Sequence, residues 1–300
     1  MAFPTTSETL TTLASYIPTV WGEKVNEFYK KKLMMADFFT DRSDELANGG
    51  NVLYTPNVGE MAANAKSNAT AVTLNAPTDT KITLTVDQWY EVSFAIEDRE
   101  AAQVKRSYSV METYAKNAGY TIASKLEVAI ATLFAGFSQV VGASTTNLAD
   151  SEIRAAITYL EEANIDTTSE CAFFMSPGVF WKQVQNLDKF SLAVNSPSND
   201  PTVKTPAAYL YGIPVHISNN IQYVASTTGR NNALAHKDAI HFATSALGSG
   251  GSMGAMVGSR GVRVQSNYIP DFLSTVTTAD MLYGVVENRD TSGVLIRTAA

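Results

Sequence analysis

The sequence has little cysteine, no excess of basic charge and no long basic run. Its 300 residues contain one cysteine, Cys171, so no intramolecular disulfide framework supports the fold. The 22 basic side chains are outnumbered by 29 acidic ones, and the net charge of -7 opposes tight binding to nucleic acid. The longest basic run is Lys30–Lys32. These deficits exclude a disulfide scaffold and disfavour a DNA-reading protein.

The chain also lacks the segments that direct a protein to or across a membrane. Residues 1–18 have neither the basic start nor the apolar centre of a secretory signal. The most apolar window, residues 128–143, contains Thr132, Ser138 and Gln139 and is shorter than the roughly 20 residues of a bilayer span. We therefore expect no membrane partner.

Catalytic motifs are incomplete. Residues 250–254 match G-x-S-x-G, but all three histidines precede Ser252, whereas a hydrolase with this motif has its histidine later in the chain. A phosphate-binding loop is excluded by the lack of any lysine after Lys237. The spacing of His236 and His241 disfavours a shared metal ion. We predict that the protein is not an enzyme and has no metal, cofactor or catalytic residue.

The composition is nevertheless that of a folded protein. Hydrophobic residues make up 45% of the chain and aromatic residues 10%, enough for a substantial core in one large or two intertwined domains. The N-terminal 47 residues differ from the rest, because residues 5–12 are polar and have no period. After them, apolar side chains at near-helical spacing predict a short amphipathic helix. These are Trp21, Val25, Phe28, Met35, Phe38 and Phe39.

Two long elements follow a strand predicted at "VLYTPNVG". Between residues 82 and 96, apolar residues alternate with polar ones, which predicts one strand of about 15 residues, roughly 50 Å long. From Glu97 to Phe137, apolar residues recur every three or four positions and predict one long helix. Elements of this length predict an extended molecule with projecting parts.

The remainder alternates helices and strands at ordinary length. Asp150 or Ser151 is expected to cap a helix, "CAFFM" reads as a buried strand, and Ser176–Pro177 begins another helix. The strand "GIPVHIS" completes a β-α-β unit. Four further strands are predicted, at "DAIHFA", "GVRVQSNYI", "STVTTADMLYGVVENR" and "GVLIRT".

This order of elements resembles the tailed-bacteriophage major capsid proteins with the Hong Kong 97 phage fold. Three stretches carry the resemblance beyond element order: "IPTVWGEKVNEFYKKKLMMADFF", "CAFFMSPGVFWKQVQNL" and "LYGVVENRDTSGVLIRT". The resemblance implies an α+β fold with four parts. These are an N-arm (1–47), an extended β-hairpin called the E-loop (48–84), a P-domain with the long spine helix (85–140 and 255–282), and a central α/β A-domain (141–254 and 283–300).

The resemblance also implies a function. The protein would self-assemble, as hexamers and pentamers, into the icosahedral head shell that encloses the phage DNA, formed in the host bacterial cytoplasm. Expected partners are a portal, a separate scaffolding protein, a decoration protein, and packaged DNA bound without sequence specificity. Candidate inter-subunit contacts lie on the arm and the E-loop. They are Trp21, Phe28, Phe38, Phe39, Tyr54, Lys66, Lys81 and Ile82.

Glycines provide candidate hinges. We interpret residues 248–261 as a flexible crossover by which the chain leaves the A-domain and returns to the P-domain. The candidate hinge or crossover residues are Gly49, Gly50, Gly250, Gly251, Gly254 and Gly258. Two alternative functions remain open: another phage structural protein, such as a tail-tube or decoration subunit, and an α/β enzyme of unknown type.

Some members of the resembled family join a hairpin lysine covalently to an asparagine of a neighbouring subunit. Lys66 and Lys81 lie in the corresponding region, but no partner asparagine or assisting acid is identified. We predict no covalent cross-link. Mature shells should therefore migrate on a denaturing gel as one band near the chain mass of 32.3 kDa. A ladder of multimers would contradict this prediction.

Overall fold

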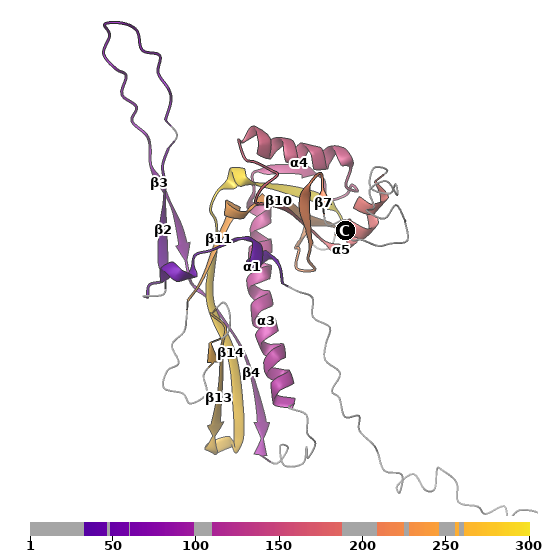
Figure 1. The fold of residues 1–300 in the computed structure, drawn as a ribbon. Helices are drawn as coiled ribbons and strands as arrows, with labels where there is room; N and C mark the ends of the chain where they lie inside the picture. Colours follow the sequence, from indigo (N-terminus) through magenta and orange to yellow (C-terminus); the bar gives the residue numbers. More distant parts are fainter. Residues whose placement is uncertain are drawn as a thin grey trace, which may run out of the picture.

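The computed structural model describes residues 33–46, 49–59, 61–98, 110–187, 209–224, 228–245, 256–257 and 261–300. Within these residues the chain forms a six-stranded sheet, a seven-stranded sheet and a separate two-stranded hairpin (Figure 1). The hairpin projects away from the two sheets, and a long helix lies alongside the strands of the six-stranded sheet. The predicted mixed and extended architecture is confirmed.

The long helix is α3 (Val110–Leu133), which the 3-10 turn η3 (Phe134–Gly136) continues. Its apolar stripe faces the protein and is buried at Ala118, Ile122, Leu126, Ile130 and Phe134. Glu97, where the long helix was predicted to begin, is the last residue of strand β4. Asp98 is helical, and residues 99–109 lie outside the described residues. Of the predicted N-terminal helix, the structure describes α1 (Met35–Phe38).

The predicted 15-residue strand is two strands in different sheets. Strand β3 (Thr80–Thr85) pairs with β2 (Val52–Asn57) in the hairpin, whereas β4 (Gln88–Glu97) pairs with β14 (Ser274–Glu287). The break falls at Val86 and Asp87, where the amide of Val86 donates instead to Asn51 O at 2.8 Å. The single prediction was wrong because the alternation of apolar residues continues across the break, with both Leu84 and Val86 buried.

The six-stranded sheet is organised around β14. Its order is β1-β11-β14-β13-β12, and β4 also pairs with β14. The buried carboxylate of Asp280 on β14 fixes the register of three strands. It accepts from Arg263 Nε of β13 at 2.9 Å and from Trp89 Nε1 of β4 at 3.1 Å. The other strands are β1 (Thr40–Asp41), β11 (Ile240–Ser245), β12 (Met256–Val257) and β13 (Arg263–Ile269).

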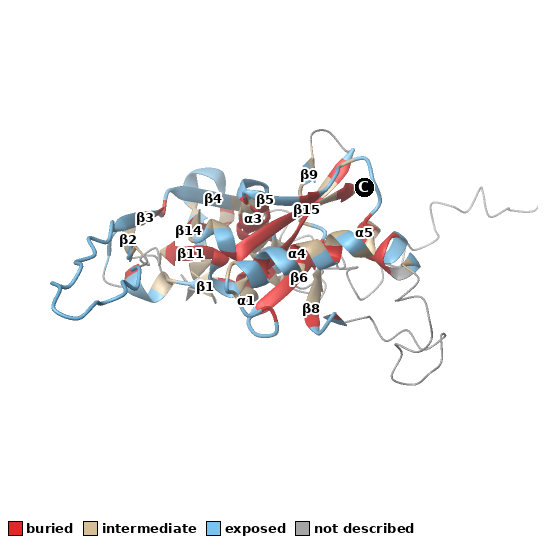
Figure 2. Ribbon diagram, turned by 90° about the horizontal axis from the view of Figure 1, so that it is seen from above, coloured by how far each residue is buried: buried red, intermediate tan, exposed pale blue. Residues whose placement is uncertain are grey.

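The seven-stranded sheet has the order β5-β15-β10-β6-β8-β7, with β9 paired to β10. Its central strand β6 (Cys171–Met175) is buried throughout, because both faces of the sheet are covered (Figure 2). Phe173 packs with α4 (Asp150–Glu162) and α5 (Pro177–Lys182), and Phe174 packs with α1 and α3. The remaining strands are β5 (Gln139–Gly142), β7 (Tyr209–Leu210), β8 (Ile213–Ile217), β9 (Tyr223–Val224), β10 (Gly229–His236) and β15 (Gly293–Ala299).

The predicted β-α-β unit is confirmed, since β6 and β8 are parallel neighbours with α5 between them in the chain. Ser176 caps α5 as predicted, accepting from the amide of Val179 at 3.4 Å. The predicted cap of α4 was wrong by one residue. Ala149 occupies the cap position, and its amide donates to the Glu152 carboxylate at 2.9 Å, so Glu152 supplies the acceptor that the alanine lacks.

The predicted crossover at residues 248–261 does not lead from one sheet to the other. Strand β11 before it and strand β13 after it belong to the same sheet, as does β12 within it. The chain passes between the two sheets elsewhere, at three 3-10 turns: η3, η6 (Lys237–Ala239) and η9 (Asp290–Ser292). These three turns and the few residues on either side of each are called the joint below.

Gly284 of β14 tests how the hairpin meets the six-stranded sheet. Any side chain at this position would collide with the backbone of Thr85 and Val86, where the chain leaves the hairpin. Gly284→Ala should therefore lower the free energy of unfolding by about 1–3 kcal/mol, measured by urea denaturation.

Gly119→Ala is the matched control. Gly119 lies in α3 with open space around it, so alanine there should raise stability by up to about 1 kcal/mol. If Gly284→Ala left the free energy of unfolding unchanged, the hairpin would not be held against β14 in this way.

Candidate functional site: the hairpin, its base and the joint

The hairpin strands place two of the predicted contact residues on one face. Tyr54 of β2 and Lys81 of β3 come together, with Lys81 Nζ 4.4 Å from the centre of the tyrosine ring. The Tyr54 side chain is 58% exposed, and Ile82 next to Lys81 is partly buried. An exposed aromatic ring with a bound cation is a ready contact for another surface.

Beyond the strands, residues 58–79 form the distal loop of the hairpin. The described residues of this loop have no helix or strand, and the two arms are linked by Asn75 Nδ2, which donates to Ala62 O at 2.6 Å. Lys66 Nζ donates to Ser67 O at 2.7 Å near the tip. Several large apolar side chains of the loop are exposed, with Leu74 at 87%. The others are Val58, Met61 and Val72.

The base of the hairpin is anchored by a small core of its own. Leu84 and Val86 are buried there against Leu46 and Ala243, and partly buried Leu53 and Leu282 extend the cluster. Burying a leucine or valine side chain contributes about 1.5–3 kcal/mol. The hairpin is therefore fixed at its base while its distal loop has no core of its own.

Two of the predicted hinge glycines lie at this base. Gly49 and Gly50 have φ angles of 97° and 120°, which favour glycine over residues with a side chain. They precede β2, so the entry to the hairpin depends on them. The other four hinge candidates (250, 251, 254 and 258) lie outside the described residues, as do Trp21 and Phe28.

The last part of the arm is packed into its own chain. Phe38 and Phe39 stack around Phe174, with ring centroids 5.3 and 5.1 Å away, and Phe39 also meets Phe134. Phe39 is only 3% exposed. In this conformation the ring is packed within its own chain, which argues against Phe39 as an inter-subunit contact.

A buried carboxylate fixes the arm to α3. Glu127 is fully buried, and its Oε1 accepts from the amides of Met35 at 2.7 Å and Ala36 at 3.2 Å, at the start of α1. Burial raises the pKa of Glu127, although the hydrogen bonds from Met35 and Ala36 act in the opposite direction. Glu127 was missed by the sequence analysis. The available signal was its position as the only charged residue in the apolar run 126–137.

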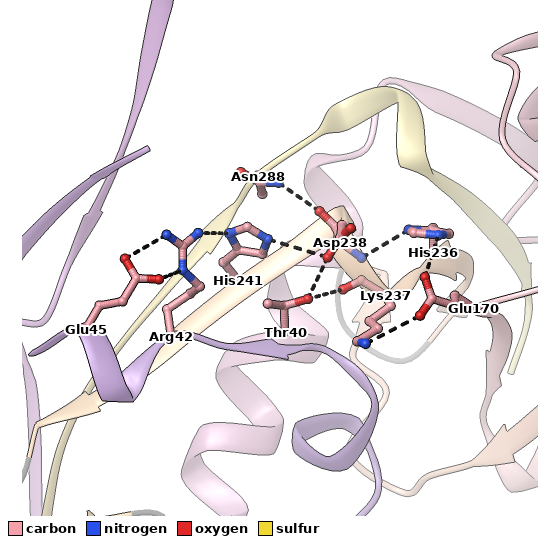
Figure 3. Close-up of polar contacts among 9 residues, drawn as sticks. All are labelled: Thr40, Arg42, Glu45, Glu170, His236, Lys237, Asp238, His241 and Asn288. Atoms are coloured by element: carbon pink, nitrogen blue, oxygen red, sulfur yellow. Dashed lines mark hydrogen bonds and ion pairs between the residues drawn. The ribbon is translucent and has the colours of Figure 1, made fainter. Parts of the chain in front are cut away.

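The joint carries a chain of polar contacts (Figure 3). Thr40 Oγ1 donates to Asp238 Oδ1 at 2.7 Å, and Asn288 Nδ2 donates to Asp238 O at 3.0 Å. Glu170 contacts both Lys237 and His236, at 3.5 and 3.7 Å. These contacts connect the arm with turn η6 and with the residue that follows β14.

His241 lies at the centre of this series of polar contacts and is 7% exposed. Burial and the adjacent Arg42 guanidinium lower its pKa, so the ring is neutral at neutral pH. Arg42 Nη1 lies 3.4 Å from His241 Nδ1 and can only donate, so Nδ1 accepts. The ring proton is therefore on Nε2, which lies 3.9 Å from Asp238 Oδ1. Burial alone would raise the pKa of Asp238, but Thr40 and the nearby histidines lower it overall.

The groups that resembled catalytic residues have structural surroundings. Cys171 is 2% exposed, and burial raises the pKa of its thiol to about 12, so the nucleophilic thiolate form is disfavoured. Among the described residues, no three His, Cys, Asp or Glu side chains are placed to hold a metal ion. No helix in the described part of the chain has the length and apolarity to span a membrane.

Comparisons with known proteins find a likeness in structure alone. No family model matches the sequence, and no curated protein matches it either. Among solved structures, a chain of Mycobacterium phage Che8 is 18% identical over 94% of this chain and 97% of its own, with a TM-score of 0.71. The capsid structure of cyanophage P-SCSP1u gives 15% identity, 96% and 94% coverage, and a TM-score of 0.73.

The mature capsid of bacteriophage PhiM1 matches with 12% identity over 94% of this chain and 92% of that chain, with a TM-score of 0.67. The chain has the fold of tailed-phage major capsid proteins. This capsid fold spans nearly the whole chain, so the hairpin, the joint and both sheets belong to one architecture. At these identities the likeness establishes the fold, and the role of each part is taken up below.

Glu127 gives a test of the arm attachment. Glu127→Ala should release the amides of Met35 and Ala36 and lower the free energy of unfolding by about 1–3 kcal/mol. Hydrogen exchange at these two amides should become faster. Glu162→Ala, at the exposed end of α4, is the control and should change neither quantity. Unchanged exchange at Met35 and Ala36 would contradict the attachment.

Proposed function

We propose that this chain is the major subunit of a phage head shell and assembles with copies of itself, as hexamers and pentamers, around the phage DNA. The observation that carries the proposal is the near full-length match to phage capsid chains, three of which cover 92% or more of both partners. The proposal places the protein in the virion after assembly in the host bacterial cytoplasm and assigns it a structural role without catalysis.

The parts of the chain take family roles within this proposal. The β2–β3 hairpin is the E-loop, α3 is the spine helix, the six-stranded sheet belongs to the P-domain and the seven-stranded sheet to the A-domain. The boundaries predicted for the N-arm (1–47) and the E-loop (48–84) are kept. Strand β11, predicted in the A-domain, is assigned here to the P-domain because it pairs with β14.

The distal loop supports an assembly role. Its apolar side chains are more exposed than is usual for a chain that acts alone, and they lie on a projecting loop that has no core of its own. Burial against a neighbouring copy would remove this apolar surface from water. Tyr54, Lys66, Lys81 and Ile82 remain proposed inter-subunit contacts, together with Trp21, Phe28 and Phe38 of the arm.

The further partners are proposals of the same kind. A head shell has a vertex through which DNA enters, so a portal is expected, and a separate scaffolding protein and a decoration protein are the other partners. The net charge of -7 favours only weak, non-specific contact with the packaged DNA.

Microscopy of the assembled protein tests the proposal. Val72→Ser combined with Leu74→Ser removes exposed apolar surface and should leave unfolding within about 0.5 kcal/mol of wild type. Negative-stain images should show closed shells for wild type and few or none for the double variant.

Thr73→Ser, in the same loop, is the matched control and should assemble as wild type does. Tubes formed by the wild-type protein would instead indicate a tail-tube subunit, and dispersed monomers would contradict both roles. Normal shells from the double variant would remove the distal loop from the proposed contacts without affecting the shell role itself.

A further inference from the structure

A pair of carboxyl groups lies in the joint, apart from the chain of contacts around His241. Glu287 is the last residue of β14, and Asp290 is the first residue of η9. Both touch the backbone that follows α3. Asp290 Oδ1 accepts from the amide of Ser138 at 2.7 Å, and Glu287 Oε2 lies so close to Gly136 that a Cβ there would be 2.7 Å away. The pair therefore connects two of the three passages between the sheets.

The two carboxyls are joined by a hydrogen bond and affect each other's pKa. Burial raises the pKa of Glu287 to about 7, and the hydrogen bond to Asp290 and the charge of Asp290 act in the same direction. Burial alone would raise the pKa of Asp290, but the hydrogen bonds from Ser138 and Glu287 lower it overall. Below about pH 7 the proton is thus on Glu287, which donates to the ionised Asp290. Loss of this proton leaves two adjacent negative charges.

The passage after α3, turn η6, strand β11 and Arg289 lie around the pair, and three of these bring charged groups. The passage from Phe134 to Ser138 carries no charged side chain. Turn η6 brings Lys237 and Asp238, which contact Glu170 and Thr40 respectively. Strand β11 brings His241, which lies beside Arg42, and the exposed Arg289 lies between the pair in sequence. The charge that acts on Glu287 is Asp290.

We propose that Glu287 and Asp290 form a proton-dependent clasp that holds the passage after α3 against the passage after β14, and that opens when Glu287 ionises. The clasp regulates how firmly the two sheets are joined within one chain. It depends on the chain alone, so it is independent of the proposed shell role.

The direction of the pH effect follows from the shift. The pKa of Glu287 is raised on folding, so its contribution to stability is complete below about pH 4.5 and is lost as the pH rises through about 7. His241 has a lowered pKa and acts in the opposite direction, since its protonation below about pH 6.5 disfavours the folded state. A local measurement at the clasp separates the two effects.

Hydrogen exchange of the Ser138 amide, corrected for the intrinsic pH dependence of exchange, tests the clasp in the purified full chain. In wild type, protection of this amide should fall about tenfold between pH 6 and pH 8, as expected for a group with a pKa near 7 when closed and 4.5 when open. Glu287→Gln carries a permanent donor and should keep its protection across this range.

Asp290→Asn provides a second variant, because it removes the charge that opposes ionisation of Glu287 while keeping an acceptor for Ser138. Its pH step should be smaller than that of wild type, although burial still raises the pKa of Glu287. Glu162→Gln, at the exposed end of α4, is the matched control and should retain the wild-type profile. A wild-type profile without a pH step, a step that persists in Glu287→Gln, or a step of undiminished size in Asp290→Asn would overturn the proposal.

Discussion

The arrangement of this chain depends on one shared core, in which the end of the long helix packs between the two sheets. Phe134 of η3 lies 5.5 Å from Phe174 of the seven-stranded sheet, and both meet Phe39 of the arm. The same buried cluster includes Phe242 and Met281 of the six-stranded sheet. Aromatic pairs of this kind contribute about 0.5–1.5 kcal/mol each beyond the area that they bury. Both sheets and the arm are thus held by the same few side chains.

This shared core explains why polar groups collect at the joint. Three turns bring the chain from one sheet to the other beside the aromatic cluster, and each leaves backbone groups that need partners. Side chains supply them: Asp290 accepts from Ser138, and Asn288 donates to Asp238 O. Some of these groups, such as Glu287 and Asp290, are titratable and partly buried, whereas the aromatic packing carries no charge.

The hairpin is subject to a different constraint. Its base is fixed by buried Leu84 and Val86, and the absence of a side chain at Gly284 lets its backbone cross β14 closely. Its distal loop extends beyond any core of its own chain and exposes Leu74. This arrangement suits the inter-subunit contact proposed for the hairpin. The fixed base sets the direction of the hairpin, and the apolar side chains of the distal loop remain free for burial against another surface.

Local periodicity determined much of this fold from the sequence alone. The helical stripe from Ala118 to Phe137, the fully buried strand at Cys171–Met175 and the Ser176 cap each depend on residues close together in the chain. The resemblance of element order to capsid proteins also required no coordinates. Other features were decided only by tertiary structure. The break at Val86 and Asp87 depends on Asn51 and Gly284, and the passage between sheets at Lys237–Ala239 depends on β14 as a pairing partner. The acceptor for Met35 is Glu127, 92 residues away. Such contacts have no local pattern, because the two partners meet only after the chain has folded.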